Sequence, residues 1–288
     1  SPAEAEAAAV AKGLWGGQGV AGARLHPLAT AMLAPLTGGV NEWSVRLPGV
    51  LATLLAGVCT ARVTRREEGR LAGMVAGAAI LTALWLAART RISAGDALAA
   101  CLVALGWLAF YWLGHVHRRW NAMWIVALLP VLLASLETGL RTFAVFYFPL
   151  CFLRRPLRIW QRMLNPVHIT ALVAALVIHR FWLYGGVVAV FTTRAAGPAA
   201  ATGSYVGGLV TYPFRCLVLA LPWALFAWPG FCAAFRPAEK RPVFTSFLRT
   251  LLVTLFLVGW ILPAVRPLVL LPLVCPLAAL TGANYDLL

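Results

Sequence analysis

Acidic side chains are scarce in this chain. It has 9 aspartates and glutamates against 24 lysines and arginines, and only 11% of its residues carry a charge. Hydrophobic residues make up 61% of the sequence, and the mean hydropathy is +0.84. Such averages require apolar runs long enough to cross a hydrocarbon layer, about 20 residues for each helix. The composition therefore excludes a soluble globular protein and predicts an integral membrane protein.

Several sequence features typical of other protein classes are absent, and each absence excludes or disfavours a class of function. A net charge of +15 would suggest nucleic acid for a soluble protein, but no basic stripe is interleaved with stacking aromatics, so we expect no nucleic acid partner. The 6 cysteines lie in or beside apolar runs without metal-ligand or disulfide spacing, and we expect them to be small buried hydrophobes. Residues 1–14 lack the apolar core of a signal peptide. Acids are nearly absent at membrane depth and no internal repeat is visible, which argues against ion-coupled transport.

The apolar runs predict an all-α, polytopic membrane protein with about nine transmembrane helices, several of them short or tilted. We expect three parts: an exterior, amphipathic helical segment over residues 1–48, a membrane domain over 49–282 and a short tail over 283–288. The spans are expected at about residues 49–61, 71–88, 97–114, 123–136, 140–153, 167–184, 207–231, 247–262 and 268–280.

Basic residues alternate between rich and poor loops along the chain. The rich loops hold Arg62, Arg65, Arg66, Arg70, Arg118, Arg119, Arg154, Arg155, Arg158, Arg162, Arg236, Lys240 and Arg241. The poor loops hold Arg89, Arg91, Arg141, Arg194 and Arg266. Because cytoplasmic loops carry the excess of lysine and arginine, residues 1–48 are expected in the periplasm of a bacterial inner membrane. We expect an anchor helix ahead of Ser1; the alternative is a short segment that is translocated without one.

Most of the polar residues that are candidates for a functional site are expected on the exterior side of the membrane. Its acids are Glu4, Glu6, Glu42, Asp96 and Glu137. Asp96 either caps a helix that begins at Ala97, as Ser93 could do equally well, or serves as a catalytic or ligand-binding acid. Exterior arginines near the membrane (Arg91, Arg141, Arg266) either bind a lipid phosphate or extend to the interface. His26 is the only histidine near the exterior acids, and no arrangement supports a metal site.

The order of these features resembles the polytopic GT-C glycosyltransferases, in particular the bacterial branch related to aminoarabinose transferase and the protein O-mannosyltransferases. The clearest piece is the stretch NEWSVRLP at 41–48, which leads into a span that ends in arginines. The family has a G-x-x-E-[WF]-x-x-R-L-P stretch in the same place. Weaker matches follow in the same order: the loop at 91–98 with its acid, the turn at 137–139, Tyr212-Pro213 with Leu221-Pro222-Trp223, and Arg266 with 271–276. The resemblance covers residues 4–282.

The resemblance implies an enzyme that moves a sugar from a polyprenyl-phosphate carrier to an acceptor on the exterior face. A carboxylate would draw the proton from the acceptor hydroxyl, and positive charge would stabilise the departing phosphate. The positions that match give Glu4, Glu6 and Asp96 as catalytic candidates. The candidates for binding the donor phosphate are His26, Arg91, Arg141 and Arg266. The sugar, the acceptor and any divalent metal are left open.

Departures from the family pattern fall on its catalytic positions. Ala3 stands where the first loop of the family has aspartate, so only Glu4 or Glu6 could substitute. His26 replaces a lysine, and Thr138 replaces another, with Arg141 one helical turn away. Two hypotheses therefore stand. The chain is either an active glycosyltransferase or a catalytically degenerate GT-C-fold subunit of a larger membrane complex, with membrane lipids as partners in both cases.

Overall fold

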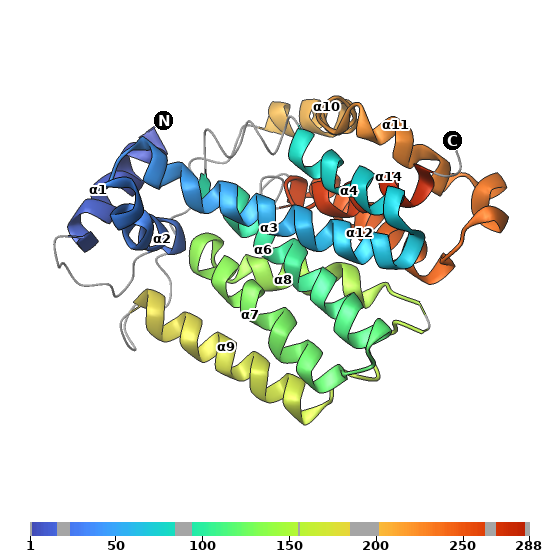
Figure 1. The fold of residues 1–288 in the computed structure, drawn as a ribbon, viewed down its shortest axis with the longest axis horizontal. Coiled ribbons are helices and arrows are strands. Elements are labelled where there is room, and N and C mark those ends of the chain that lie inside the picture. The colour runs from blue at the N-terminus through green and yellow to red at the C-terminus, as the bar shows by residue number, and fades with distance from the viewer. Residues whose placement is uncertain are drawn as a thin grey trace.

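The computed structural model describes residues 2–15, 24–83, 94–154, 156–184, 202–262 and 269–285. All regular elements in these ranges are helices, which confirms the all-α prediction. The longer helices are packed into a bundle (Figure 1). They are α1 (Pro2–Trp15), α2 (Leu25–Leu33), α3 (Glu42–Glu68), α4 (Arg70–Thr82), α6 (Ala94–Ala109), α7 (Trp120–Thr138), α8 (Arg141–Cys151), α9 (Pro166–Tyr184), α10 (Thr202–Ala220), α12 (Pro242–Ile261) and α14 (Val274–Asn284). Short elements connect them: η1 (Ala34–Thr37), the π-helical η2 (Phe110–Val116), α11 (Trp223–Ala227), η3 (Trp228–Phe231) and η4 (Ala233–Ala238).

Four helices in the described ranges are long and apolar enough to cross a membrane: Glu42–Glu68, Gly95–Val116, Trp120–Thr138 and Pro242–Ile261. Three shorter helices are also apolar: Arg70–Thr82, Pro166–Trp182 and Val274–Asn284. The run expected as one span over 207–231 is a bent pair, in which Leu209–Val218 and Trp223–Phe231 meet at 93°. The chain is thus a multi-pass membrane protein, and the count of about nine spans stays a prediction.

Helix α3 begins earlier than the predicted first span. Asn41 and Ser44 form a capping box, because the Ser44 amide donates to Asn41 Oδ1 at 3.0 Å and the Asn41 amide donates to Ser44 Oγ at 2.8 Å. The following residues, 42–48, are helical and continue without a break into the membrane helix. The stretch NEWSVRLP therefore makes the cap and first turns of a long helix.

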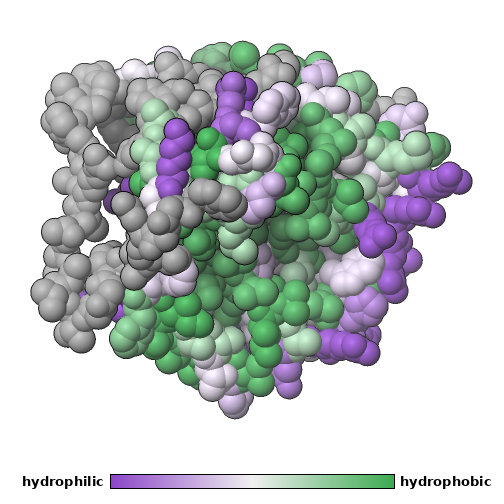
Figure 2. Space-filling model, turned by 60° about the vertical axis from the view of Figure 1, so that its left-hand side comes forward, coloured by the Kyte–Doolittle hydropathy of each residue, from purple (hydrophilic) through white to green (hydrophobic). Residues whose placement is uncertain are grey.

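The two ends of the bundle differ in character. Helices α1 and α2 lie together with the start of α3 (blue) at one end, which we call the α1–α2 end (Figure 1). At the opposite end the arginine-rich segments meet: the Arg162 guanidinium lies 3.4 Å from the Trp120 ring centroid, and that of Arg66 lies 4.9 Å from Trp112. Figure 2 shows hydrophilic residues gathered along one edge of a broad hydrophobic surface, the distribution that a bilayer imposes.

Helix α6 is the centre of the packing. Trp107 of α6 is fully buried, as are Phe110 and Tyr111 of η2, which continues α6. Phe110 meets Trp124 of α7 and Phe247 of α12 with ring centroids 6.0 and 6.4 Å apart. The indole of Trp107 donates to the carbonyl oxygen of Phe146 in α8 at 3.0 Å, so its polar atom is satisfied away from water. This core holds α7, α8 and α12 in fixed positions around α6.

The close approach of α6 to α7 requires a glycine at position 106. A Cβ at Gly106 would lie 2.9 Å from Val131 Cγ2 and 3.0 Å from the Ala127 carbonyl oxygen. We expect Gly106→Ala to lower the free energy of unfolding in detergent by about 1–3 kcal/mol, because the backbone oxygen cannot yield. The control is Gly207→Ala in α10, where an added Cβ meets nothing within 4 Å. An equal loss in both variants would contradict this packing.

Candidate functional site

Glu137, next to the last residue of α7, joins three helices at the α1–α2 end. Its Oε2 accepts the backbone amide of His26 in α2 at 2.8 Å. Its other oxygen lies against Gly95 at the start of α6, so closely that any Cβ at Gly95 would overlap it. The sequence separation of Glu137 and His26 is 111 residues. One carboxylate thus fixes the relative positions of α2, α6 and α7.

The side chain of His26 connects α2 to α3 through a hydrogen bond. Its Nε2 lies 2.7 Å from the carbonyl oxygen of Val45, and since a carbonyl only accepts, Nε2 carries the proton. The side chain is 4% exposed, and Thr30 Oγ1 donates to the His26 carbonyl oxygen at 2.9 Å. Because Nε2 is already engaged, only Nδ1 remains for a ligand. The prediction that His26 holds phosphate stays a prediction.

Asp96 lies beside this joint, in the first turn of α6, where the helix dipole favours its charge. The helix begins at Ala94 and not at Ala97, so Asp96 is inside the first turn and not in the capping position considered from the sequence. It lines a small hollow together with Thr138 of α7, Thr142 of α8 and Pro272. The hydroxyl groups of Thr138 and Thr142 are in hydrogen-bond contact.

Cations flank the acids at this end. Arg24, directly before α2, interacts electrostatically with Glu137, as does Asp96. Arg141 is the first residue of α8 and is exposed. Arg141 was predicted from the sequence as a site residue, whereas Arg24 and Glu137 were not. The signal for Arg24 was its place in the stretch RLHP, and that for Glu137 was an acid at the exterior end of an apolar run.

For the other four site residues predicted from the sequence, the structure gives less information about their position. Glu4 and Glu6 belong to α1, which packs against α2. Arg91 and Arg266 lie outside the described residues. Over the described ranges, no three histidine, cysteine or acidic side chains gather in a way that could hold a metal ion. The structure brings together His26, Asp96 and Glu137, with Arg24 close to them and Arg141 on the next helix.

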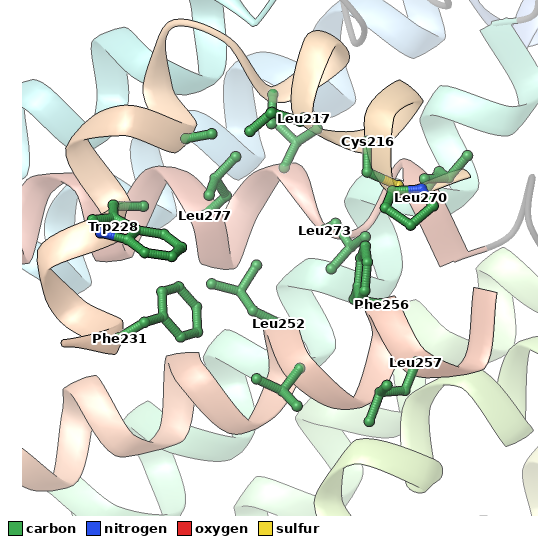
Figure 3. A pocket seen from close by; sticks show the side chains of 16 residues that line it. Cys216, Leu217, Trp228, Phe231, Leu252, Phe256, Leu257, Leu270, Leu273 and Leu277 are labelled. Carbon is green, nitrogen blue, oxygen red and sulfur yellow. The ribbon is translucent and has the colours of Figure 1, made fainter. Parts of the chain in front are cut away.

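An apolar cavity of about 530 Å³ lies next to this cluster, within the size range of ligand sites in proteins. Figure 3 shows Trp228 and Phe231 of η3 at one end of it and Cys216 and Leu270 at the other. Helices α10, α11, α12 and α14 supply the rest of its lining. Leu270 and Leu273 line this cavity, while Pro272 between them lines the hollow at Asp96. The segment from 269 to 273 therefore lies between the apolar cavity and the polar hollow.

These features define a polytopic, all-helical membrane protein with a polar cluster at one end and an apolar cavity beside it. The fold is that of ArnT from Cupriavidus metallidurans, with a TM-score of 0.75 for its apo crystal structure and 0.79 for the structure bound to undecaprenyl phosphate. Both comparisons have 18% sequence identity and cover 100% of this chain and 56% of the other, so the chain spans about half the length of ArnT. The chain thus has a GT-C-like fold, as the resemblance predicts. No family model and no curated protein matches the sequence.

The joint at Glu137 can be tested by its contribution to stability. We expect Glu137→Ala to reduce the free energy of unfolding by about 1–3 kcal/mol, because the buried amide of His26 loses its acceptor. Glu137→Gln should lose less, since its amide oxygen can still accept that hydrogen bond. Denaturant titration in detergent measures both.

The control for that experiment is Glu42→Ala. Glu42 is 72% exposed and pairs with Arg46 at 2.7 Å, a surface ion pair worth at most about 1 kcal/mol. A loss at Glu137 no larger than the loss at Glu42 would show that the joint is not structural.

Proposed function

We propose that this chain is a membrane glycosyltransferase that moves a sugar from a polyprenyl-phosphate donor to an acceptor hydroxyl. The observation that carries the proposal is the adjacency of two environments: a polar cluster with cations and an apolar cavity, separated by residues 269–273. A donor of this class needs both, because it has a phosphate head and a long hydrocarbon tail. The ArnT structure bound to undecaprenyl phosphate has the same fold, which supports this donor class.

The proposed orientation places the α1–α2 end in the periplasm and the arginine-rich end in the cytoplasm of a bacterial inner membrane. The support is the charge distribution: the end of α3, the start of α4 and the segments before α7, α9 and α12 carry 13 of the 24 lysines and arginines. The α1–α2 end of the described chain carries fewer cations: Lys12, Arg24, Arg46, Arg141 and Arg180, the last on α9 beside His179, which bonds Ser135 of α7. Transfer would therefore take place on the exterior face.

We place the polyprenyl tail in the apolar cavity and the phosphate at the exterior ends of α2 and α8. Arg141 is exposed and can fork onto phosphate oxygens, and Arg24 adds positive charge across the cluster. Arg91 and Arg266 are proposed as further phosphate ligands on the sequence resemblance alone. His26 contributes mainly by position, since its backbone amide and Nε2 are both engaged in helix contacts.

In the proposed reaction Asp96 is the general base. The acceptor oxygen attacks the anomeric carbon, the bond from that carbon to the phosphate oxygen breaks, and the polyprenyl phosphate leaves with the electron pair. The acceptor proton passes to the Asp96 carboxylate, and Arg141 stabilises the charge that develops on the phosphate. Glu4 and Glu6 on α1 are the alternative acids, because α1 packs on the helix that carries His26.

The second candidate is a catalytically degenerate subunit of a membrane complex. The observation in its favour is that Glu137 accepts a hydrogen bond from the backbone amide of His26 and so connects α7 to α2. Purification in mild detergent separates the candidates. An accessory subunit co-purifies with a stoichiometric partner and transfers no sugar under conditions in which a homologous transferase works.

The base assignment predicts the effect of a single change. Asp96→Asn should lower kcat by about 10²–10⁴-fold with labelled polyprenyl-phosphate sugar, because the amide cannot take the acceptor proton. The control is Glu42→Gln, which removes an exposed carboxylate at the same end and should leave kcat unchanged. Wild-type activity in the Asp96 variant would show that another residue is the general base.

The cavity assignment predicts a change in donor affinity alone. Leu257→Trp adds bulk to the cavity wall at a residue that is 40% exposed, so the helix itself should tolerate it. We expect KM to rise for a long polyprenyl donor and to stay unchanged for one with a single isoprene unit. The control is Leu129→Trp on α7, which is 58% exposed and outside the cavity. Equal effects on both donors would place the tail elsewhere.

A further inference from the structure

A second charged surface lies at the arginine-rich end, away from the proposed transferase site. Two stretches form it, 117–121 before and at the start of α7 and 152–165 between α8 and α9. Asn165 Nδ2 donates to Asn121 Oδ1 at 2.8 Å, and the Arg162 guanidinium lies over the Trp120 ring. We call this surface, with its exposed Arg118, Arg119, Arg154 and Arg158, the α7–α9 basic face.

One side of the stretch 152–165 is buried against the bundle, and the other side is exposed. Its buried residues are Leu153, Leu157 and Ile159, which are 5%, 2% and 0% exposed. The large apolar side chains of Trp160 and Leu164 face outward at 54% and 81% exposure. Exposed arginines and exposed apolar side chains therefore share one anchored surface.

Neither of the two stretches that form this face contains an acidic residue. From 115 to 165 the only acidic residue is Glu137, which lies at the far end of α7. The other acids of the arginine-rich end, Glu67, Glu68 and Glu239, belong to different segments, and Glu239 is paired with Arg249 at 2.8 Å. Within the described part of the chain, none of the four exposed arginines of the α7–α9 basic face forms an ion pair.

We propose that the α7–α9 basic face binds the phosphate head groups of anionic phospholipids in the adjoining leaflet. A guanidinium forks onto phosphate oxygens, and basic pockets between membrane helices attract anionic head groups. Tryptophan lies preferentially at the membrane interface, so Trp160 and Leu164 enter the acyl region beside the bound head group. A soluble anion would match the arginines but would leave both apolar side chains in water. The proposal does not depend on transferase activity.

The test is lipid titration of the full chain in neutral detergent, read by native mass spectrometry. Phosphatidylglycerol is compared with phosphatidylcholine of the same acyl chains. We expect the wild type to prefer phosphatidylglycerol, and Arg118→Gln with Arg158→Gln to weaken that binding about fivefold for each arginine removed. The matched control is Arg62→Gln with Arg70→Gln, in the stretch that contains Glu67 and Glu68; it should keep the preference.

Additional experiments test whether the effect depends on charge, whether the variant folds, and whether the ligand is a lipid or a soluble anion. Arg118→Lys with Arg158→Lys keeps the charge and should keep most of the preference. If the glutamine variant does not fold, as judged by circular dichroism, the wild type is titrated at rising ionic strength, where phosphatidylglycerol binding should fall. Equal binding of the two lipids by the wild type, or an equal loss in the control variant, would overturn the proposal. Displacement of the lipid by inorganic phosphate would assign the face to a soluble anion instead.

Discussion

The hydrogen bond between the His26 amide and Glu137 is the constraint on which the α1–α2 end depends. A carboxylate at the end of a membrane helix is costly unless its charge is satisfied, and a backbone amide is costly unless it has an acceptor. Here the His26 amide donates to Glu137 Oε2 at 2.8 Å, so both groups are satisfied. Gly95 has no side chain and therefore leaves room for Glu137 Oε1. The result positions Asp96, which follows Gly95, next to the hollow shared with α7 and α8. Without this joint the cluster would have no defined geometry.

The apolar cavity depends on a different constraint, the bend between α10 and α11. A straight helix over this stretch would leave no concave wall, whereas the 93° bend brings Trp228 and Phe231 round to face α12. Side chains from two neighbours hold the bent segment: Arg249 donates to the carbonyl oxygen of Gly230 at 2.9 Å, and Asn284 donates to that of Ala227 at 3.1 Å. Two backbone carbonyl oxygens of the segment after the bend are thus satisfied inside the protein, as a membrane environment requires.

Composition and hydropathy are sufficient to predict the class of fold, because a bilayer permits few structures and an all-α bundle is one of them. The resemblance to GT-C proteins was visible in the order of short motifs, and the shared fold with ArnT confirms it. The joint at Glu137 was not predictable, since its partner is 111 residues away and is a backbone atom that any residue would supply. The bend in residues 209–231 was missed for a related reason: apolar composition is the same for a straight and a bent span.

The most direct test of the central claim is to locate a polyprenyl phosphate on the protein. A donor analogue with a photoreactive group on its tail is bound to the purified chain in detergent, irradiated, and its attachment points are mapped by mass spectrometry. The account predicts attachment to α10, α12 or the 270–277 segment, at residues such as Leu217, Leu257 and Leu273, and its loss when unlabelled polyprenyl phosphate competes. Attachment confined to the lipid-facing sides of α7 and α9 would contradict it.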